Sequence, residues 1–319
     1  MSNVKSLVNQ LKGPIMIFGA GGFIGINLLK KLISYRNDVI GVSSNLKKSW
    51  RIKQNLIPEK NLAEADLLDA QSIKRLTAKF KPQTIFNLAA YGAYPKQKDT
   101  ERIYQTNFIT TVNLIETLKK YGFKSYIHAG SQSEYGLNCK APKEDEELIP
   151  NSHYAVSKAN VYHLLKYYGK IEFLPVVHLR LYSVYGPWEE PDRLIPVLIV
   201  RAKKKELPQF VDPNISRDFI YVDDVVDAFI TSAIKMKKDL YGEVFNIATG
   251  RKTTIKELAF LAKKLFKIIE EPKFNTMINR QWDLSEWYGN ADKIKTKLGW
   301  QAKTKLKEGL LKTFNYDYT

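Results

Sequence analysis

Residues 19–25 read GAGGFIG, which places glycines at positions 19, 22 and 25. The apolar run PIMIFGA (14–20) leads into this stretch, and the amphipathic run FIGINLLKKLISY (23–35) follows it. Glycines at this spacing permit a tight turn, let backbone approach a diphosphate, and allow a helix to pack closely on a strand. The helix N-terminus adds free N–H groups and a partial positive charge. The stretch therefore predicts a dinucleotide-binding turn. The residues expected to contact the cofactor there are Gly19, Gly22, Phe23, Ile24 and Gly25.

Short apolar runs alternate with longer amphipathic runs through the first half of the chain, which is typical of βαβ units and a parallel sheet. The expected fold is α/β, a Rossmann-type doubly wound parallel sheet with a smaller C-terminal substrate-binding lobe. Strands are expected at 14–20, 38–43, 84–90, 124–131 and 176–186, and helices at 23–35, 72–80, 110–122 and 154–169.

The regular alternation of apolar and amphipathic runs ends after Tyr185, where prolines divide the chain into shorter elements. This change predicts a domain boundary. Residues 1–185 are expected to form the dinucleotide-binding domain, with 217–262 returning to it. Residues 186–216 and 263–319 are expected to form mainly the substrate-binding lobe.

Composition narrows the classes of function. The 319 residues are 44% hydrophobic, with one cysteine and a formal net charge of +17. The lysines are spread along the chain and accompany no nucleic-acid-binding motif, so nucleic acid is not an expected partner. The four histidines show no metal-ligand spacing, so no metal site is expected. With no apolar run long enough for a membrane span and no possible internal disulfide, a cytoplasmic location is expected.

The end of the second expected strand bears on the choice of cofactor. An acidic residue about 20 positions after the glycine turn normally holds the ribose hydroxyls of NAD. This chain instead has Ser43 and Ser44, followed by Lys47, Lys48 and Arg51. Hydroxyls and cations accept a 2′-phosphate, whereas a carboxylate repels one. NADP is therefore the expected cofactor, and NAD held by other contacts is the alternative.

A tyrosine and a lysine are spaced for proton transfer. Tyr154 and Lys158 lie four residues apart at the start of an expected helix, so they share one helical face. A nearby ammonium favours the phenolate form of a tyrosine. Such a tyrosine can exchange a proton with a sugar hydroxyl while a hydride moves to or from nicotinamide. Ser131, at the end of the strand before it, supplies a hydroxyl for the reacting oxygen. The candidate catalytic residues are Ser131, Tyr154 and Lys158.

Six segments in order carry a resemblance to a known family: GAGGFIG, NLAA, HAGSQSEYG, YAVSK, LRLYSVYGP and SRDFIYVDDV. The chain resembles the extended short-chain dehydrogenase/reductases, and within them the nucleotide-sugar epimerase/dehydratase branch, over nearly its whole length. The resemblance implies a nucleotide-diphosphate sugar as substrate and a homodimer that pairs helices near 105–120 and 153–168.

The resemblance also implies roles for single residues. Asp66 and Leu67 match the position that contacts adenine, Ala89 and Ala90 follow a strand that lines the cofactor, and Asn107 matches an asparagine behind the active site. Arg217 and Arg280 are expected at the substrate diphosphate, where forked charge-assisted hydrogen bonds suit phosphate oxygens. Asp223 and Asp224 are expected to cap a helix.

Departures from the family pattern bear on the reaction. Dehydratases of this branch carry Asp and Glu directly after the active-site hydroxyl, and here these positions are Gln132 and Ser133. Glu134 would face the other way on an extended strand. Dehydration is therefore disfavoured. The cysteine and lysine that 3,5-epimerising reductases of the family place around the substrate are not identifiable either, since Cys139 falls in an expected loop.

Oxidation or reduction at C4 with exchangeable NADP(H) is the preferred interpretation, and 4-epimerisation with tightly held NAD is the alternative. A cofactor-binding regulator without catalysis also fits such a fold, but it gives the set of Ser131, Tyr154 and Lys158 no purpose.

Substrate specificity is expected to come from the second lobe and from the segment after the strand at 84–90. We expect Tyr94, Ser133 and Arg193 to contact the substrate, with Tyr91 and Pro95 bordering the sugar. The aromatic residues that could stack on a nucleobase, or simply form the core of the lobe, are Trp188, Phe210, Trp282 and Trp287.

Overall fold

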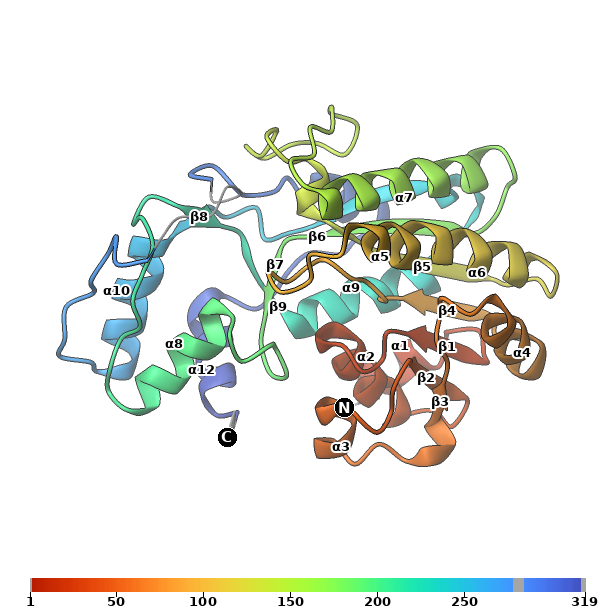
Figure 1. Cartoon of the computed structure of the whole chain (residues 1–319), viewed down its shortest axis with the longest axis horizontal. Helices are drawn as coiled ribbons and strands as arrows, with labels where there is room; N and C mark the ends of the chain where they lie inside the picture. The colour runs from red at the N-terminus through yellow and green to blue at the C-terminus, as the bar shows by residue number, and fades with distance from the viewer. Residues whose placement is uncertain (1, 278–283, 317–319) are drawn as a thin grey trace.

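The computed structural model describes residues 2–277 and 284–316. Its centre is a seven-stranded parallel sheet with the strand order β10-β6-β5-β4-β1-β2-β3, which confirms the expected Rossmann-type α/β fold (Figure 1). The strands are β1 (Ile15–Phe18), β2 (Val39–Ser43), β3 (Leu62–Glu64), β4 (Thr84–Asn87), β5 (Ser125–Ser131), β6 (Val176–Leu181) and β10 (Glu243–Ile247).

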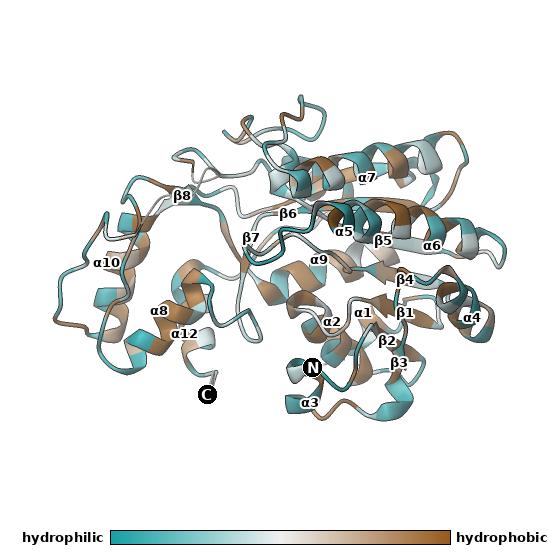
Figure 2. Ribbon diagram, in the orientation of Figure 1, coloured by the Kyte–Doolittle hydropathy of each residue, from teal (hydrophilic) through white to brown (hydrophobic). Residues whose placement is uncertain are grey.

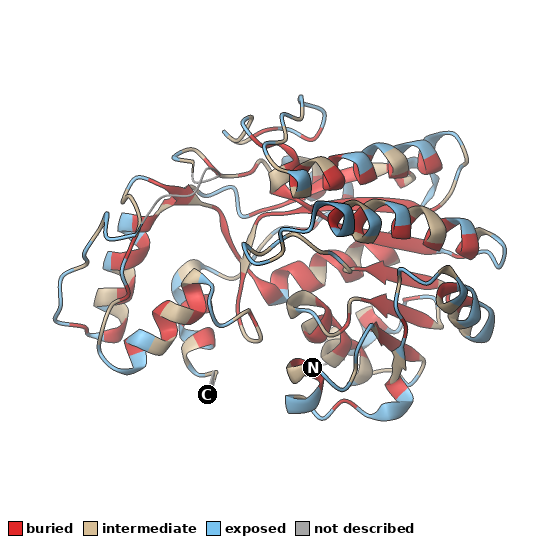
Figure 3. Ribbon diagram, in the orientation of Figure 1, coloured by how far each residue is buried: buried red, intermediate tan, exposed pale blue. Residues whose placement is uncertain are grey.

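Helices cover both faces of this sheet, so its strands are apolar on both sides (Figures 2 and 3). In β1, Ile15 and Ile17 join the core under one layer of helices, and Met16 and Phe18 join the core under the other. The first layer contains α2 (Phe23–Ile33) and α9 (Val222–Ile234), and the second contains α4 (Ala70–Phe80), α6 (Thr110–Lys119) and α7 (His153–Lys170).

A smaller lobe lies beside the carboxyl edge of the sheet, where α8 (Leu194–Lys203), α10 (Ile255–Phe266) and α12 (Leu306–Phe314) pack together. Two small sheets join it to the main domain. One pairs β8 (Ser216–Arg217) with β11 (Thr253–Thr254), and the other pairs β7 (Ser183–Tyr185) with β9 (Phe219–Tyr221). Within residues 217–262, α9 packs on the main sheet and β10 joins it, whereas α10 packs in the lobe.

The expected strand at 176–186 was wrong as one element, because it divides at Tyr182. The N–H of Tyr182 still bonds to Ile247 in β10, but Ser183 then donates to Asp218 and the chain enters the β7–β9 sheet. Short elements also escaped the sequence reading, since a few residues show no full period. They are α1 (Ser2–Val8), α3 (Trp50–Gln54), η1 (Glu59–Asn61), β3, α5 (Thr100–Tyr104), η2 (Gln105–Ile109), η3 (Gln132–Glu134), η4 (Lys238–Leu240) and α11 (Asp292–Leu298).

The strand order reverses between β1 and β4, which is where ligands bind in open α/β sheets. The glycine turn lies at this switch point. Gly19 has φ +79°, and a Cβ there would lie 2.7 Å from the backbone nitrogen of Ala89. A Cβ on Gly25 would lie 2.2 Å from the carbonyl oxygen of Gly19. Residues 19–25 therefore form a turn that packs directly against the end of β4. Positions 19 and 25 leave no room for a Cβ, so only glycine fits there.

Replacing Gly25 with alanine tests this packing. Alanine in a helix normally stabilises by about 0.5–1 kcal/mol relative to glycine, but the contact with Gly19 reverses the sign. We expect G25A to lower the free energy of unfolding by about 1–3 kcal/mol and to weaken dinucleotide binding, as measured by urea denaturation and calorimetric titration. In the control G22A, the added Cβ would lie 3.2 Å from the carbonyl oxygen of Gly19, so a smaller loss of stability is expected. A G25A variant as stable as the parent would contradict the packing.

Candidate active site

The glycine turn leaves an open helix end at the switch point. Gly22 is the N-cap residue of α2, with extended backbone and no side-chain cap. Its N–H donates to Gly19, and the first intrahelical bond after it runs from Ile26 to Gly22. The N–H groups of Phe23, Ile24 and Gly25 therefore have no acceptor within the helix. This backbone fits a diphosphate, because no Cβ or capping side chain occupies the place of the anion.

Ser131 ends β5 and is the N-cap of the 3₁₀ segment η3. Its Oγ accepts a hydrogen bond from the N–H of Ser133 at 3.1 Å, and its backbone N–H donates to the carboxylate of Glu134 at 2.8 Å. Its side chain also acts on the phenol of Tyr154, whose pKa it lowers. Both hydroxyls come to one point at the carboxyl edge of the sheet.

Tyr154 and Lys158 lie on the first turns of α7, which Ser152 caps by accepting from Ala155. Lys158 is only 1% exposed, and its Nζ donates to the carbonyl oxygen of Ala129 at 2.9 Å. Burial lowers the pKa of Lys158 to about 8. The structure thus brings together the three residues that the sequence predicted as catalytic.

The phenol of Tyr154 is protonated in this arrangement. Burial raises its pKa to about 12, and the neighbouring Ser131 side chain acts in the opposite direction. The Lys158 Nζ lies 6.0 Å from the centre of its ring. A further cation beside the phenol, such as an oxidised nicotinamide, would favour the phenolate. The group can therefore exchange a proton with a substrate hydroxyl when the cofactor's charge is present.

Asn107 lies behind this set, in the π-helical turn η2 between α5 and α6. Its side chain accepts from the N–H of Tyr91 and donates to the carbonyl of the same residue, both at 2.9 Å. It also donates to Ser157, which is next to Lys158 in α7. Asn107 therefore ties the segment after β4 to the helix that carries Tyr154.

At the expected adenosine end, the structure adds an acid that the sequence reading missed. Ser43 pairs in register with Glu64 of β3, and the Glu64 Oε2 accepts from the N–H of Leu46 at 2.8 Å. This carboxylate lies beside the loop of Ser43 and Ser44. The sequence did not indicate it because it ends β3, a three-residue strand without a visible pattern.

Arg51 does not serve as a free cation at this end. It is 7% exposed, its Nε donates to the carbonyl of Trp188 at 2.7 Å, and its Nη2 pairs with Glu190 at 2.9 Å. Of the three expected cations, Lys47 and Lys48 remain exposed. Asp66 is exposed and Leu67 half-buried just after β3, while Ala89 and Ala90 follow β4 beside the glycine turn.

On the lobe side, Tyr94 and Arg193 lie close to the phenol. The guanidinium of Arg193 lies 5.8 Å from the ring centre of Tyr94, and the charges of both groups act on Tyr154. Glu189 is 6% exposed and lies 3.7 Å from Arg193. Burial raises the pKa of Glu189 to about 8. Ser133 also lies here, and its N–H donates to the Ser131 Oγ.

Arg217 lies in β8, with its guanidinium 4.9 Å from the ring centre of Trp287, a buried residue. Asp218, the next residue, is fully buried and accepts from the N–H groups of Thr249 and Gly250 at 2.9 Å each. Asp218 therefore fixes the position of β8. Arg280 and Trp282 lie outside the described residues.

Several aromatic and acidic residues have structural places. Phe210 is 1% exposed in the core of the lobe, so it is not available to a nucleobase. Trp188 packs against Trp50, with ring centres 6.0 Å apart. Asp223 and Asp224 lie in the first turn of α9, but Tyr221 is the N-cap residue and no side chain caps it. The expectation of a capping pair was wrong, and Asp224 instead accepts from the N–H of Thr304.

The expected extended course of residues 132–134 was also wrong. These residues form η3, and Glu134 turns into the protein, where it is fully buried. Its carboxylate accepts from His178 and Arg180 of β6 at 2.8 Å each. A histidine and an arginine at alternate positions of a buried strand were the signal that a buried acid must lie opposite.

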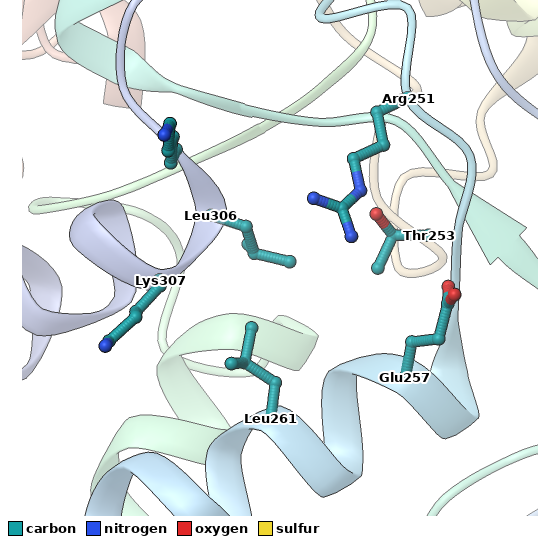
Figure 4. Close-up of a pocket in the computed structure, with 7 residues that line it drawn as sticks. Arg251, Thr253, Glu257, Leu261, Leu306 and Lys307 are labelled. Carbon is teal, nitrogen blue, oxygen red and sulfur yellow. The ribbon is translucent and has the colours of Figure 1, made fainter.

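Other kinds of site find no support in the part of the chain that the structure describes. It contains no group of three or more His, Cys, Asp or Glu side chains placed to hold a metal, and no helix long and apolar enough to cross a membrane. A small hollow lies in the lobe between α10 and α12, and no residue predicted from the sequence lines it (Figure 4).

The glycine turn at the switch point is typical of a dinucleotide-binding protein. Three residues suited to proton transfer, Ser131, Tyr154 and Lys158, lie at the same edge of the sheet. Residues 15–248 match the model of the NAD dependent epimerase/dehydratase family. The chain belongs to this family, whose members include nucleotide-sugar epimerases and dehydratases.

Individual relatives span nearly the same length. A UDP-glucose 4-epimerase of Mycolicibacterium smegmatis is 30% identical over 311 residues, covering 94% of this chain and 97% of the relative. Among solved structures, a UDP-glucose 4-epimerase of Thermotoga maritima with UDP-glucose matches with TM-score 0.83 and 30% identity, covering 95% and 97%. A UDP-glucuronic acid 4-epimerase of Bacillus cereus, in complex with UDP-glucuronic acid and NAD, matches with TM-score 0.82 and 27% identity, covering 95% and 98%.

The burial of Lys158 predicts a pH dependence of stability. Its pKa in the folded protein, about 8, is below the ordinary lysine value of 10.5, so the unfolded chain binds more protons between these values. The parent protein should therefore gain up to about 3 kcal/mol from this residue as pH rises through that window. The variant K158M lacks this gain. Urea denaturation from about pH 7.5 to 10 should show the free energy of unfolding of the parent rising relative to that of K158M as the pH rises.

The matched control is K166M, which removes an exposed lysine from the same helix. Its stability should follow that of the parent across the same range. Parallel curves for K158M and the parent would show that Lys158 is not desolvated as the structure has it.

Proposed function

We propose that this chain interconverts the C4 epimers of a UDP-linked sugar by reversible hydride transfer, with NAD held in the switch-point site. The observation that carries the proposal is the convergence of Ser131, Tyr154 and Lys158 beside residues 132 and 133, which are not acids. The relatives named above are called 4-epimerases and match nearly the whole of this chain, which supports the same reaction.

Each residue of the set has a distinct role in this proposal. When bound, NAD supplies a reversible acceptor for the hydride of C4. Tyr154 takes the proton of the C4 hydroxyl as the hydride leaves, and gives it back as the hydride returns to the other face. Ser131 hydrogen-bonds the reacting oxygen and the phenol. Lys158 holds a positive charge beside the phenol, and its bond to Ala129 orients the ammonium.

Dehydration needs more than this set, because a hydroxyl must be protonated and a neighbouring carbon deprotonated. Gln132 donates to Ser183 and Ser133 donates its N–H to Ser131, and neither side chain titrates in the required range. Glu134 cannot replace them, since it is fully buried and accepts three hydrogen bonds inside the protein.

A C4 reductase or dehydrogenase with exchangeable NADP(H) is the second candidate, and the preferred one on sequence alone. Ser43 and Ser44 favour it, because hydroxyls at this position accept a 2′-phosphate. Two contacts favour NAD instead. Glu64 places a carboxylate beside this loop, and Arg51, the cation that a phosphate would need, is paired with Glu190. A carboxylate repels a 2′-phosphate but accepts from ribose hydroxyls.

We place the substrate between the two domains. Arg217, with Arg280, would bind the diphosphate, and Tyr94, Ser133 and Arg193 would border the sugar near Tyr154. We also propose a homodimer through α6 and α7 and a cytoplasmic location, as the family resemblance and the single cysteine suggest.

The reaction itself distinguishes the two candidates. Incubation with UDP-glucose, UDP-galactose or the corresponding uronic acids should convert each into its C4 epimer with no net change in nicotinamide absorbance. The variant Y154F should lower kcat by about 100-fold or more, because proton transfer is lost, while dinucleotide binding persists. Stoichiometric oxidation of NADPH by a 4-keto-sugar would instead support the reductase.

Cofactor choice is tested by binding. Calorimetric titration of apo-protein should give a lower Kd for NAD than for NADP. In E64Q, removal of the carboxylate should shift the ratio of the two constants toward NADP by about tenfold. The control E59Q removes an exposed acid of η1 and should leave the ratio unchanged. Tighter binding of NADP to the parent would support the sequence-based inference and overturn the choice of NAD.

A further inference from the structure

A buried ionic cluster lies directly behind Ser131, and the proposed reaction does not use it. Its centre is Glu134, which is fully buried in η3 and paired with Arg180 of β6, also fully buried. Burial of a charged pair is costly unless its hydrogen bonds are satisfied. A cluster of this kind next to a reaction centre therefore calls for a reason beyond stability.

The carboxylate of Glu134 is surrounded by donors. Its Oε1 accepts from the Ser131 N–H and from the His178 Nε2, and its Oε2 accepts from the Arg180 Nε, all at 2.8 Å. Only a group with two acceptor oxygens satisfies all three. A glutamine would place an N–H₂ among these donors and lose at least one bond. The site is therefore built for an ionised carboxylate. Burial raises the pKa of Glu134, but the charges and hydrogen bonds of His178 and Arg180 outweigh it and lower the pKa to about 2.

The backbone that leads to Ser131 rests on this pair. A Cβ on Gly130 would lie 2.2 Å from the His178 Nε2 and 2.6 Å from the Glu134 Oε1. Gly130 thus lets the end of β5 contact the ion pair without a side chain between them. Any shift of the carboxylate would move the strand end that carries Ser131.

The other side of the cluster is fixed by aromatic and polar groups. The Arg180 guanidinium lies 4.5 Å from the ring centres of both Tyr135 and Tyr162. Its Nη1 donates to the Tyr135 hydroxyl at 2.8 Å, and that hydroxyl bonds to Asn246 of β10 at the same distance. Glu134 is therefore bonded directly to β5 and β6, and it is linked to β10 through Arg180 and Tyr135.

The charge of Glu134 also reaches the proton-transfer groups. It raises the pKa of Lys158 against the effect of burial, and it raises the pKa of Tyr154. The other titratable groups that act on or face Lys158 are His128 of β5, His178 of β6 and Tyr154 of α7. Burial lowers the pKa of both histidines, so they are neutral near pH 7. Glu134 is thus the acid whose charge favours the Lys158 ammonium.

We propose that Glu134 is a positioning residue for the candidate catalytic set. Its carboxylate fixes the backbone of Ser131, so that the hydroxyl meets Tyr154, and supplies the fixed negative charge that keeps Lys158 protonated. His178 and Arg180 hold the carboxylate in place. The inference rests on the proposed reaction for its kinetic consequence, but the charge relation between Glu134 and Lys158 can be measured without it.

Two variants separate position from charge. E134Q removes the charge, so the pH profile of kcat should move to lower pH by about one unit, because Lys158 and Tyr154 both titrate at lower pH without Glu134. E134D keeps the charge but is one methylene shorter. It should lower kcat by about tenfold or more, at little change in KM, and leave the profile in place. A profile unmoved in E134Q, or an unchanged kcat in E134D, would overturn the proposal.

The matched control is E144Q. Glu144 is a second buried acid of the same network, 4% exposed, whose Oε1 accepts from the Asn246 N–H at 2.9 Å. A loss of stability alone would affect E144Q and E134Q alike, without moving the pH profile. If E134Q does not fold, the kcat of E134D decides the matter.

A measurement on the apo-protein separates this proposal from the reaction. With lysine labelled by ¹³C at Cε, the buried Lys158 is assigned by its loss in K158M and titrated by NMR. Its pKa should fall in E134Q and stay in E144Q. A fall without any epimerase activity in the parent would refute the proposed reaction and keep the charge relation, whereas an unchanged pKa would overturn the role of Glu134.

Discussion

The hydrogen bond from the buried Lys158 ammonium to the carbonyl of Ala129 joins α7 to the end of β5, and the candidate site depends on it. A lysine that is 1% exposed is costly to bury, so its single charge needs an acceptor and a counter-charge nearby. The carbonyl supplies the first and Glu134 the second. With the helix fixed at this point, Tyr154 lies one turn away, beside the hydroxyl of Ser131 two residues along the strand.

The same edge of the sheet carries the cofactor site, because the strand order reverses between β1 and β4. The glycine turn, the end of β4 and the end of β5 lie in adjacent strands, so a dinucleotide bound at the turn extends toward Tyr154. In the proposed function the lobe closes the other side, with Arg193 and Arg217 as substrate ligands. The fold thus places the glycine turn and the candidate proton-transfer set along one edge.

Much of this could be predicted from the sequence. The turn at 19–25 and the helices at 23–35, 110–122 and 154–169 show clear spacing and periodicity, and Tyr154 and Lys158 share a helical face. The bounds of the helices after residue 190 were not predicted. The remainder depends on contacts between distant segments. Nothing near Glu134 indicates that Arg180, 46 residues away, will pair with it. The sequence predicted Arg51 as a phosphate ligand, but in the folded chain it is paired with Glu190. β3 was too short to show a pattern, so Glu64 was missed beside Ser43.

The central claim is that the hydride removed from C4 returns to the same carbon while the nicotinamide stays bound. Incubation of the purified protein with UDP-glucose deuterated at C4, followed by mass spectrometry and NMR of the epimer, tests this most directly. The account predicts that the deuterium is retained at C4 of UDP-galactose, with none in added free nicotinamide dinucleotide. Loss of the label from C4, to solvent or to exchangeable cofactor, would contradict it.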